Sequence, residues 1–491
     1  MIFLSDLRKF VSDVGVTFIA SAIGMLLGFP ITVILGRYLG ADDLGLYRIV
    51  NTIFGTIMLF VTIGIPAAII KYVAEFRGND EKLEQIVSAG LITSILLGLI
   101  SFVSIYLSAG LFANFFHMPE LSGLLKILAF AFPFSIVTNM LLGLLNGLRE
   151  MTKNAWISII QSASMLVLTF LLVFNYGVNG AVVGIVFSYI LSTLLLIFVQ
   201  KISNLTFSNF FDNSIQLINF GSKTVLSNAI NLINYQADIL MIGYFMTKTD
   251  VGVYSIAVMF AKLIWILPDS IQRITFPLIS EYHAKKMNES IHILVDKCMK
   301  YSCLFLVFCT TFFIFFGNKV ISLVFGAEFE HSYFPLIILL IGTVLYGVTK
   351  SVGSIFASVG KVTLVYKIPL VSAISNIILN YVLIPVYGIN GAAVATTISF
   401  VVSTALMIHY MKILINLKVD FIWYIKVLCL TGFLLCFYLI SKNLINNMLL
   451  GLILMIIELI LFVAYFVPNQ DRNNLFHLFE IFHFPQISQK N

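Results

Sequence analysis

The sequence carries few charged residues. Asp, Glu, Lys and Arg make up only 11% of its 491 residues, whereas apolar residues make up 60%. A soluble domain carries about 25% charged residues, so a soluble chain of this length could not cover its surface with so few. Composition therefore excludes a soluble globular protein and makes lipid the solvent for most of the chain. The net charge of +6 is spread over short loops, so nucleic acid is not an expected partner.

The sequence also lacks the motifs that enzymes and cofactor sites need. Its five cysteines form no Cys-x-x-Cys pair, and no cluster of histidines lies near them. No Gly-x-x-x-x-Gly-Lys-[Ser/Thr] phosphate loop occurs, and the short polar loops contain no Asp-x-Asp. We therefore expect no catalytic residues, no metal, no cofactor and no enzymatic activity.

Long apolar runs fill most of the chain. Each run is long enough to cross about 30 Å of hydrocarbon as a helix. The pattern predicts an all-α integral membrane protein with about 14 transmembrane helices. The predicted spans are 14–35, 47–70, 86–109, 122–146, 156–175, 179–200, 223–246, 252–278, 301–325, 334–358, 367–385, 389–411, 422–441 and 447–467.

The positions of Lys and Arg predict the orientation. Loops on one predicted side hold Lys71, Arg77, Lys285 and Lys286, whereas the turns at 110–121, 175–179 and 385–390 hold no Lys or Arg. Because positive loops stay in the cytoplasm, we expect a multi-pass protein of the cytoplasmic membrane with both termini cytoplasmic.

Two motifs recur in the same order. The motif at 36–47, Gly-Arg-Tyr followed by Asp-Leu-Gly-Leu-Tyr, returns 207 residues later at 243–254 as Gly-Tyr-Phe followed by Asp-Val-Gly-Val-Tyr. The turn Tyr-Gly-Val-Asn-Gly-Ala at 176–181 returns 211 residues later at 387–392. Asn and Gly suit the tight reversal of a helical hairpin.

This repeat predicts the domain organisation. Each copy holds six spans, an even number, so both copies enter the membrane from the same side. A pseudo-two-fold axis along the membrane normal should relate them, as in transporters built from parallel repeats. The predicted parts are an N-lobe at 1–205, a C-lobe at 206–415, and an extra helical hairpin with a cytoplasmic tail at 416–491.

The stretch Leu-Gly-Arg-Tyr-Leu-Gly-Ala-Asp-Asp-Leu-Gly-Leu-Tyr at 35–47 resembles the first helix junction of polysaccharide-biosynthesis flippases. These belong to the superfamily of multidrug, oligosaccharidyl-lipid and polysaccharide exporters. The count of fourteen spans resembles that of the branch containing stage V sporulation protein B and the lipid II flippases. The resemblance implies a V-shaped pair of lobes that work by alternating access. It also implies a monomer that transports a lipid-diphosphate-linked glycan among membrane lipids, with H⁺ or Na⁺ as the candidate coupling ion.

Ionisable residues at membrane depth are the candidates for the binding site, because such groups are costly there and face a cavity or a partner. Asp238 shares one helix face with Asn231, and Lys262 lies in the following span. Asp238 and Lys262 either contact substrate or form a purely structural ion pair.

The first lobe offers Arg37, Arg48 and Asn51. Arg37 matches an arginine common in the junction motif of the family. A guanidinium donates two hydrogen bonds at once, which suits a diphosphate. The alternative is that both arginines extend to the membrane interface without touching substrate.

Two other functions remain open from the sequence. One is a multidrug exporter of the same superfamily, coupled to protons or sodium. The other is a membrane-embedded glycan polymerase or transferase, which would need a sizeable segment outside the membrane bearing paired carboxylates or a metal site.

Overall fold

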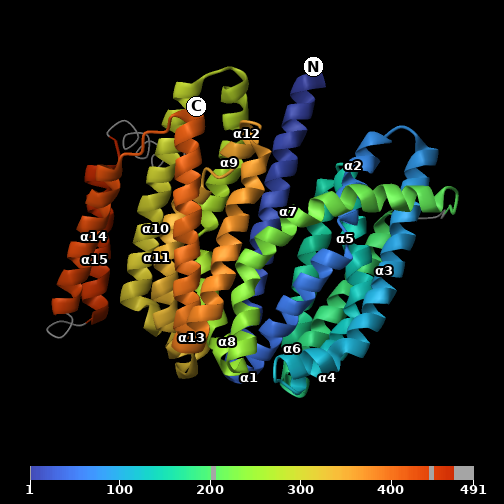
Figure 1. Cartoon of the computed structure of the whole chain (residues 1–491), viewed down its shortest axis with the longest axis horizontal. Helices are drawn as coiled ribbons and strands as arrows, with labels where there is room; N and C mark the ends of the chain where they lie inside the picture. Colours follow the sequence, from blue (N-terminus) through green and yellow to red (C-terminus); the bar gives the residue numbers. More distant parts are fainter. Residues whose placement is uncertain (1, 201–205, 442–446, 469–491) are drawn as a thin grey trace, which may run out of the picture. The chain divides into compact units, whose positions relative to one another are not determined.

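The computed structural model describes the backbone of residues 2–200, 206–441 and 447–468, and side chains over the same ranges apart from 2–19, 21, 22, 25, 226–235 and 447. Regular structure in these ranges is helical throughout (Figure 1). Helices are expected because lipid cannot hydrogen-bond the backbone and a helix satisfies its own N–H and C=O groups. The all-α prediction is confirmed.

The helices follow one another with short connections. Their bounds are α1 Ile2–Val61, α2 Ile65–Glu75, α3 Asp80–Phe115, α4 Glu120–Ala129, α5 Ala131–Gly147, α6 Met151–Gln200, α7 Phe210–Phe245, α8 Lys248–Leu263, α9 Ile266–Ala284, α10 Asn288–Phe325, the 3₁₀ helix η1 Ala327–Ser332, α11 Tyr333–Lys350, α12 Ile355–Ser358, α13 Val362–Ile415, α14 Phe421–Ser441, α15 Asn447–Leu461 and the π-helical turn η2 Phe462–Phe466.

Three of the longest helices are hairpins. α1, α6 and α13 each contain one glycine with non-helical backbone angles, at Gly40 (φ 78°), Gly177 (φ 56°) and Gly388 (φ 60°). A positive φ is strained for other L-residues and is open to glycine. In α1 the reversal brings Arg48 back beside Thr32, to which its guanidinium donates a hydrogen bond of 2.9 Å.

The two copies of the Tyr-Gly-x-Asn-Gly turn have the same geometry. Their glycines have ψ angles of −139° and −141°. A Cβ built on Gly180 would lie 2.4 Å from the carbonyl oxygen of Leu172, and one built on Gly391 would lie 2.3 Å from that of Leu383. Gly391 follows Gly180 by 211 residues, and Leu383 follows Leu172 by the same number. The turns predicted from the repeat are confirmed.

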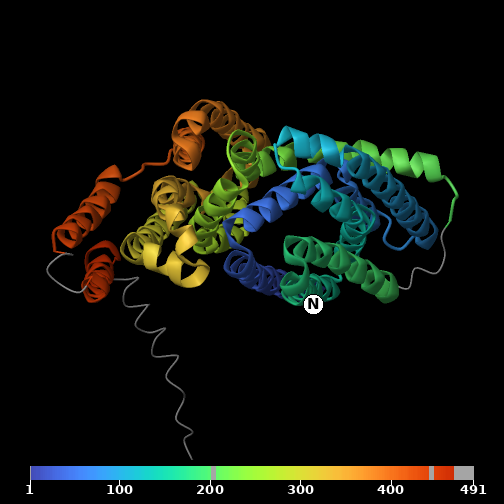
Figure 2. The same cartoon turned by 90° about the horizontal axis from the view of Figure 1, so that it is seen from below.

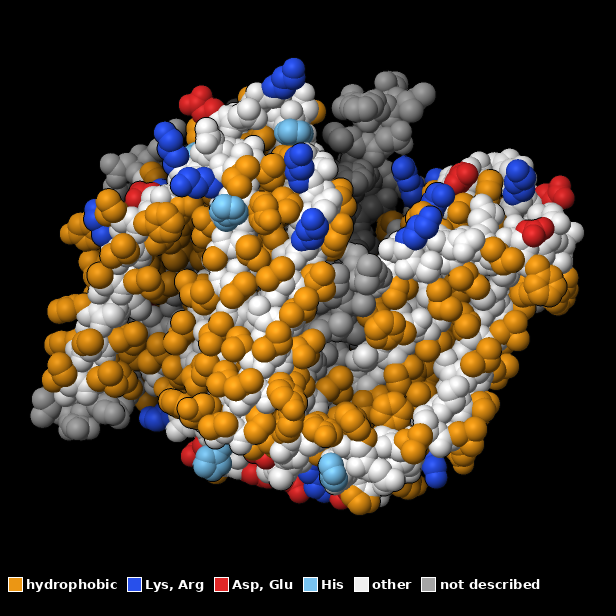
Figure 3. Space-filling model, viewed as in Figure 1, with side chains coloured by type: hydrophobic (Ala, Val, Ile, Leu, Met, Phe, Trp, Pro, Cys, Tyr) orange, Lys and Arg blue, Asp and Glu red, His pale blue; other side chains and the backbone are white. Residues whose placement is uncertain are grey.

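The helices are long and apolar enough to span a membrane. Among the described residues, eight helices are long and apolar enough to cross a membrane, or up to ten if the bent pairs α4–α5 (45°) and α8–α9 (44°) each form one span. In this total α1, α6 and α13 each count as one helix, although each contains a glycine reversal. On the face seen in Figure 3, apolar side chains cover the middle of the helices, and charged side chains lie near their ends. A multi-pass membrane protein is confirmed, and the count of fourteen stays a prediction.

The two copies of the first repeat motif contact each other reciprocally. A Cβ on Gly45 would lie 1.8 Å from the carbonyl oxygen of Lys248, and a Cβ on Gly252 would lie 2.0 Å from that of Ala41. Lys248 and Gly252 follow Ala41 and Gly45 by 207 residues, so each contact is the counterpart of the other. Such reciprocity is what a local pseudo-two-fold axis produces. The direction of that axis relative to the membrane stays a prediction.

This correspondence extends to the ends of α3 and α10. Glu328, just after α10, accepts a hydrogen bond from the N–H of Ala41 at 3.1 Å. Glu120, just after α3, accepts one from the Nζ of Lys248 at 2.8 Å. The two residues that donate to these carboxylates, Ala41 and Lys248, occupy the same position in the two copies of the repeat. Both lie at the start of a helical arm, where a nearby negative charge is favourable.

The described chain divides into two compact units. The first contains 1–258, 321–335 and 369–399, and the second contains 259–320, 336–368 and 400–491. Within the first unit α1 lies beside α6 (Figure 2). Within the second, the α14–α15 hairpin packs on α10 through Phe315, Phe316, Leu434, Tyr438, Leu450, Leu454 and Met455. The predicted lobes at 1–205 and 206–415 and the hairpin part at 416–491 stay a prediction.

Candidate functional site

Asp238 is a buried carboxylate near the end of α7, with 6% of its surface exposed. The hydroxyls of Tyr254 and Thr396 donate to its Oδ2 at 2.9 and 2.6 Å, and the amide of Asn380 donates to its Oδ1 at 2.7 Å. Tyr254 belongs to α8, whereas Asn380 and Thr396 lie on the two arms of the α13 hairpin. All of these residues belong to the first unit.

A second buried amide supports these contacts. Asn376, one turn before Asn380, donates to the hydroxyl of Thr396 at 3.2 Å and accepts from the amide of Asn380 at 3.0 Å. Both asparagines are buried. The reversal at Gly388 makes this arrangement possible because it sets the two arms of α13 side by side.

The cluster stabilises a negative charge without neutralising it. Each group that donates to Asp238 is neutral, and Asp238 forms no ion pair with a described residue of its unit. The Oδ1 of Asn380 is buried and has no hydrogen-bond partner. Because an uncompensated buried charge is costly, a cation beside Asp238 would offset the cost of this buried carboxylate.

Sequence reasoning found the carboxylate and missed its partners. Asp238 was predicted to share a face with Asn231 and to lie near Lys262. The side chain of Asn231 is outside the described residues. Lys262 is exposed and belongs to the second unit, so its pairing with Asp238 stays a prediction. The feature that could have indicated these partners is the pair Asn376 and Asn380, which lie one helical turn apart in the stretch 368–411, where no Asp, Glu, Lys or Arg occurs.

The structure brings Arg37, Arg48 and Asn51 onto one hairpin, α1. Arg37 is exposed and donates from Nε to the carbonyl of Val324 at 2.9 Å and from Nη2 to that of Leu323, so it caps the end of α10. Arg48 is half-buried, and its Nε has no partner. No carboxylate of the described residues pairs with Arg48. Asn51 is half-buried.

The second unit holds its own pair of opposite charges. Lys350 of α11 lies 2.6 Å from Asp269 of α9, and its ammonium lies 4.3 Å from the ring centre of Trp265. The indole N–H of Trp265 donates to the carbonyl of Thr343 at 3.0 Å. Both charges have partners, so this pair is explained by structure alone.

Sequence reasoning overlooked a further carboxyl group, that of Glu458 in α15. Glu458 is fully buried, and its Oε1 accepts hydrogen bonds from Thr311 of α10 at 3.0 Å and Thr431 of α14 at 3.1 Å. It joins three helices of the second unit. The sequence does distinguish Glu458, because it is the only charged residue in the predicted span 447–467.

The sequence matches the family model described as polysaccharide biosynthesis protein over residues 10–283, and a second model, MatE, over residues 224–382. The chain belongs to the polysaccharide biosynthesis protein family. The resemblance predicted from residues 35–47 is confirmed.

A curated relative shows the same similarity along most of its length. The probable low-salt glycan biosynthesis flippase of Haloferax volcanii is 25% identical over 406 residues, which cover 82% of this chain and 84% of the relative.

Solved structures show that the fold is shared. The lipid II flippase MurJ in an inward closed conformation aligns over 92% of this chain and 99% of its own, with a TM-score of 0.75 and 16% identity. A multidrug resistance MATE transporter of the MOP superfamily aligns over 80% of this chain and 94% of its own, with a TM-score of 0.69 and 13% identity.

Proposed function

We propose that the protein is a flippase that moves a lipid-linked oligosaccharide or polysaccharide precursor across the cytoplasmic membrane by alternating access. The observation that carries this proposal is family membership over residues 10–283. The proposal is supported by the similarity to a glycan biosynthesis flippase and by the fold shared with a lipid II flippase. The protein would act as a transporter and not as an enzyme.

A diphosphate head group needs cationic donors in the membrane. Bare charge in hydrocarbon is prohibitive, so the head group must exchange its hydration for protein groups. Arg48 suits this role because its guanidinium is half-buried, keeps one N–H without a partner and has no carboxylate partner among the described residues. Arg37 is a second candidate, although two of its donors already serve the end of α10. Asn51, Asn231 and Lys262 remain further candidates.

The driving energy would come from a cation at Asp238. A bound H⁺ or Na⁺ would offset the cost of the buried carboxylate, because every group that donates to it is neutral. Uptake at this site would couple the ion to the arms of α13, which supply Asn380 and Thr396. The protein would act as a monomer with both termini in the cytoplasm.

A cation-coupled multidrug exporter is the alternative. It is favoured by the MatE match over 224–382 and by the fold shared with a multidrug transporter. The Asp238 cluster would serve either function. The two functions differ in their need for Arg48, because a multidrug substrate has no diphosphate to hold.

The deciding experiment uses proteoliposomes that contain a fluorescent polyprenyl-diphosphate oligosaccharide, with a quencher that reaches only the outer leaflet. We expect transport by the wild type, more than tenfold loss in Arg48→Gln, partial loss in Arg37→Lys and a larger loss in Arg37→Ala. Arg77→Gln is the charge-matched control, because Arg77 is exposed in the loop after α2 and donates to the carbonyl of Leu148. Rates are compared per folded protein.

Full activity of the double variant Arg37→Ala, Arg48→Ala would remove both arginines from the mechanism. Transport of ethidium without transport of the glycan lipid would replace the flippase proposal with the multidrug one.

A further inference from the structure

A pocket of about 640 Å³ opens in the second unit, where the last part of α13 meets α11 and the linker to α14. It is separate from the Asp238 cluster, which lies in the first unit. The lining residues are Leu345, Val401, Thr404, Ala405, Ile408, His409, Lys412, Leu417, Lys418, Val419 and Phe421. We call it the α13 pocket.

One part of the α13 pocket is an apolar groove. Leu345, Val401, Ala405 and Ile408 line it with hydrocarbon, and Leu345 and Val401 are 38% and 42% exposed. From Val401 to Lys412 the helix rises about 16 Å at 1.5 Å per residue. That length is roughly half of the ~30 Å hydrocarbon core, which is the depth of one leaflet. The apolar part therefore matches one acyl chain of one leaflet.

The mouth of the α13 pocket is basic. His409, Lys412 and Lys418 line it, and no carboxylate does. Neither lysine forms an ion pair with a described residue. The nearby Asp420 is directed elsewhere, because it lies 3.8 Å from Lys300 and caps the start of α14. The mouth thus presents positive charge at the end of a membrane helix.

Two features show that the α13 pocket is a built site. The backbone N–H of Lys418 donates to Nε2 of His292 at 3.0 Å, and Leu417 is buried at 3% exposure, so the linker is held in place. The hydroxyl of Thr404 is buried and has no hydrogen-bond partner. This hydroxyl lies between the apolar residue Val401 and the basic residue Lys412 along α13, where it can donate to the ester carbonyl of a lipid whose chain lies in the apolar part.

We propose that the α13 pocket binds an anionic phospholipid of the surrounding bilayer. Its phosphate would lie against Lys412, Lys418 and His409, and one acyl chain would lie along α13 towards Val401. Basic pockets between membrane helices recognise anionic head groups in this way. The bound lipid would fix the linker between α13 and the α14–α15 hairpin. This role is independent of the transported molecule, because the pocket spans only one leaflet.

The test measures phosphatidylglycerol and phosphatidylcholine binding to the purified full chain by native mass spectrometry. We expect phosphatidylglycerol to bind more tightly than phosphatidylcholine. The double variant Lys412→Gln, Lys418→Gln should bind phosphatidylglycerol roughly 25-fold more weakly, at about fivefold per lysine. The double variant Lys285→Gln, Lys286→Gln removes the same charge from an exposed loop of the same unit and should stay within twofold of the wild type.

A second variant tests the apolar part without changing charge. Ala405→Trp fills the α13 pocket and should also weaken phosphatidylglycerol binding, with Val401→Trp in its place if the first does not fold. Unchanged phosphatidylglycerol binding in both the charge variant and the filled variant would overturn the proposal. A polyprenyl diphosphate that binds this pocket and resists displacement by phosphatidylglycerol would also overturn it, in favour of a substrate site. Neither result would affect the Arg48 experiment.

Discussion

At the scale of residues, the charged side chains within the helices differ in what faces them. Lys350 has an opposite charge beside it, that of Asp269. The carboxyls of Asp238 and Glu458 receive hydrogen bonds only from neutral groups, and Arg48 has one hydroxyl partner and an N–H without any. Since a lone charge inside a membrane protein is costly, these three residues call for an explanation, and the proposed function uses two of them, Asp238 and Arg48.

Replacement of Asp238 by Asn should abolish cation binding while the fold is kept, because the amide retains the shape and one carbonyl oxygen. In the wild type, exchange of choline chloride for sodium chloride at constant ionic strength should raise the melting temperature. A ligand at 100 times its Kd stabilises by about 2.7 kcal/mol. Asp238→Asn should lose this shift, whereas the control Asp212→Asn, at the exposed start of α7, should keep it. A sodium shift that persists in Asp238→Asn would place the ion elsewhere.

At the scale of helices, the crossing of α1 and α8 depends on two glycines. Gly45 and Gly252 each sit against the backbone of the other copy of the repeat. Beside them the hydroxyl of Thr249 donates to Asp42, its own counterpart 207 residues earlier. Small residues let membrane helices approach closely, where van der Waals contact stabilises the pair. This crossing therefore joins the two repeats closely within the first unit.

Gly45→Ala should destabilise the protein strongly, because its Cβ would lie 1.8 Å from a backbone oxygen that cannot move without its helix. Overpacking of this kind costs about 1–3 kcal/mol. Gly110→Ala in α3 is the matched control, since nothing lies within 4 Å of its Cβ. The measurement is the melting temperature in detergent, followed by fluorescence-detected size exclusion. Equal melting temperatures for the two variants would show that the crossing is looser than described.

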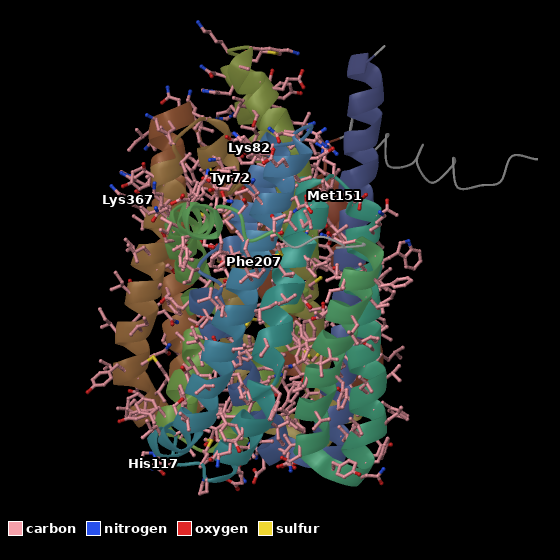
Figure 4. All side chains as sticks on the ribbon, turned by 90° about the vertical axis from the view of Figure 1, so that its right-hand side faces the viewer. Tyr72, Lys82, His117, Met151, Phe207 and Lys367 are labelled. Atoms are coloured by element: carbon pink, nitrogen blue, oxygen red, sulfur yellow. The ribbon has the colours of Figure 1, made fainter. Side chains whose placement is uncertain are left out.

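At the scale of the whole molecule, the orientation in the membrane is a prediction from the positions of Lys and Arg. Lys82 and His117 mark opposite ends of α3 (Figure 4). From the bias of Lys and Arg we predict that the Lys82 end faces the cytoplasm. The same bias predicts that the turns near Asn179 and Asn390 are outside and that the loop at Lys285 is inside.

Single cysteines in a cysteine-free background test this orientation. An impermeant maleimide added to intact cells should label cysteines at positions 179 and 390 and should leave one at position 285 unlabelled until the cells are opened. Native Cys429 and Cys436 are exposed, so both must be replaced first. Labelling at position 285 alone in intact cells would reverse the assignment.

Features that depend on local interactions follow from the sequence alone. Helices follow from apolar length, because each helix forms its hydrogen bonds within its own segment. The turns at Gly177 and Gly388 follow from residues that permit a positive φ. The repeat, the family and the isolated carboxyl of Asp238 can also be recognised in the sequence, because a motif and a single charge in an apolar stretch need no knowledge of the fold.

Which side chains meet depends on the tertiary fold. Asn380 and Thr396 reach Asp238 from 142 and 158 residues away, and Arg37 reaches the end of α10 across 287 residues. Membrane helices are apolar on all sides, so hydrophobicity does not mark which face meets lipid and which meets another helix. The partners of a buried polar group are therefore set by long-range packing, which the sequence does not display.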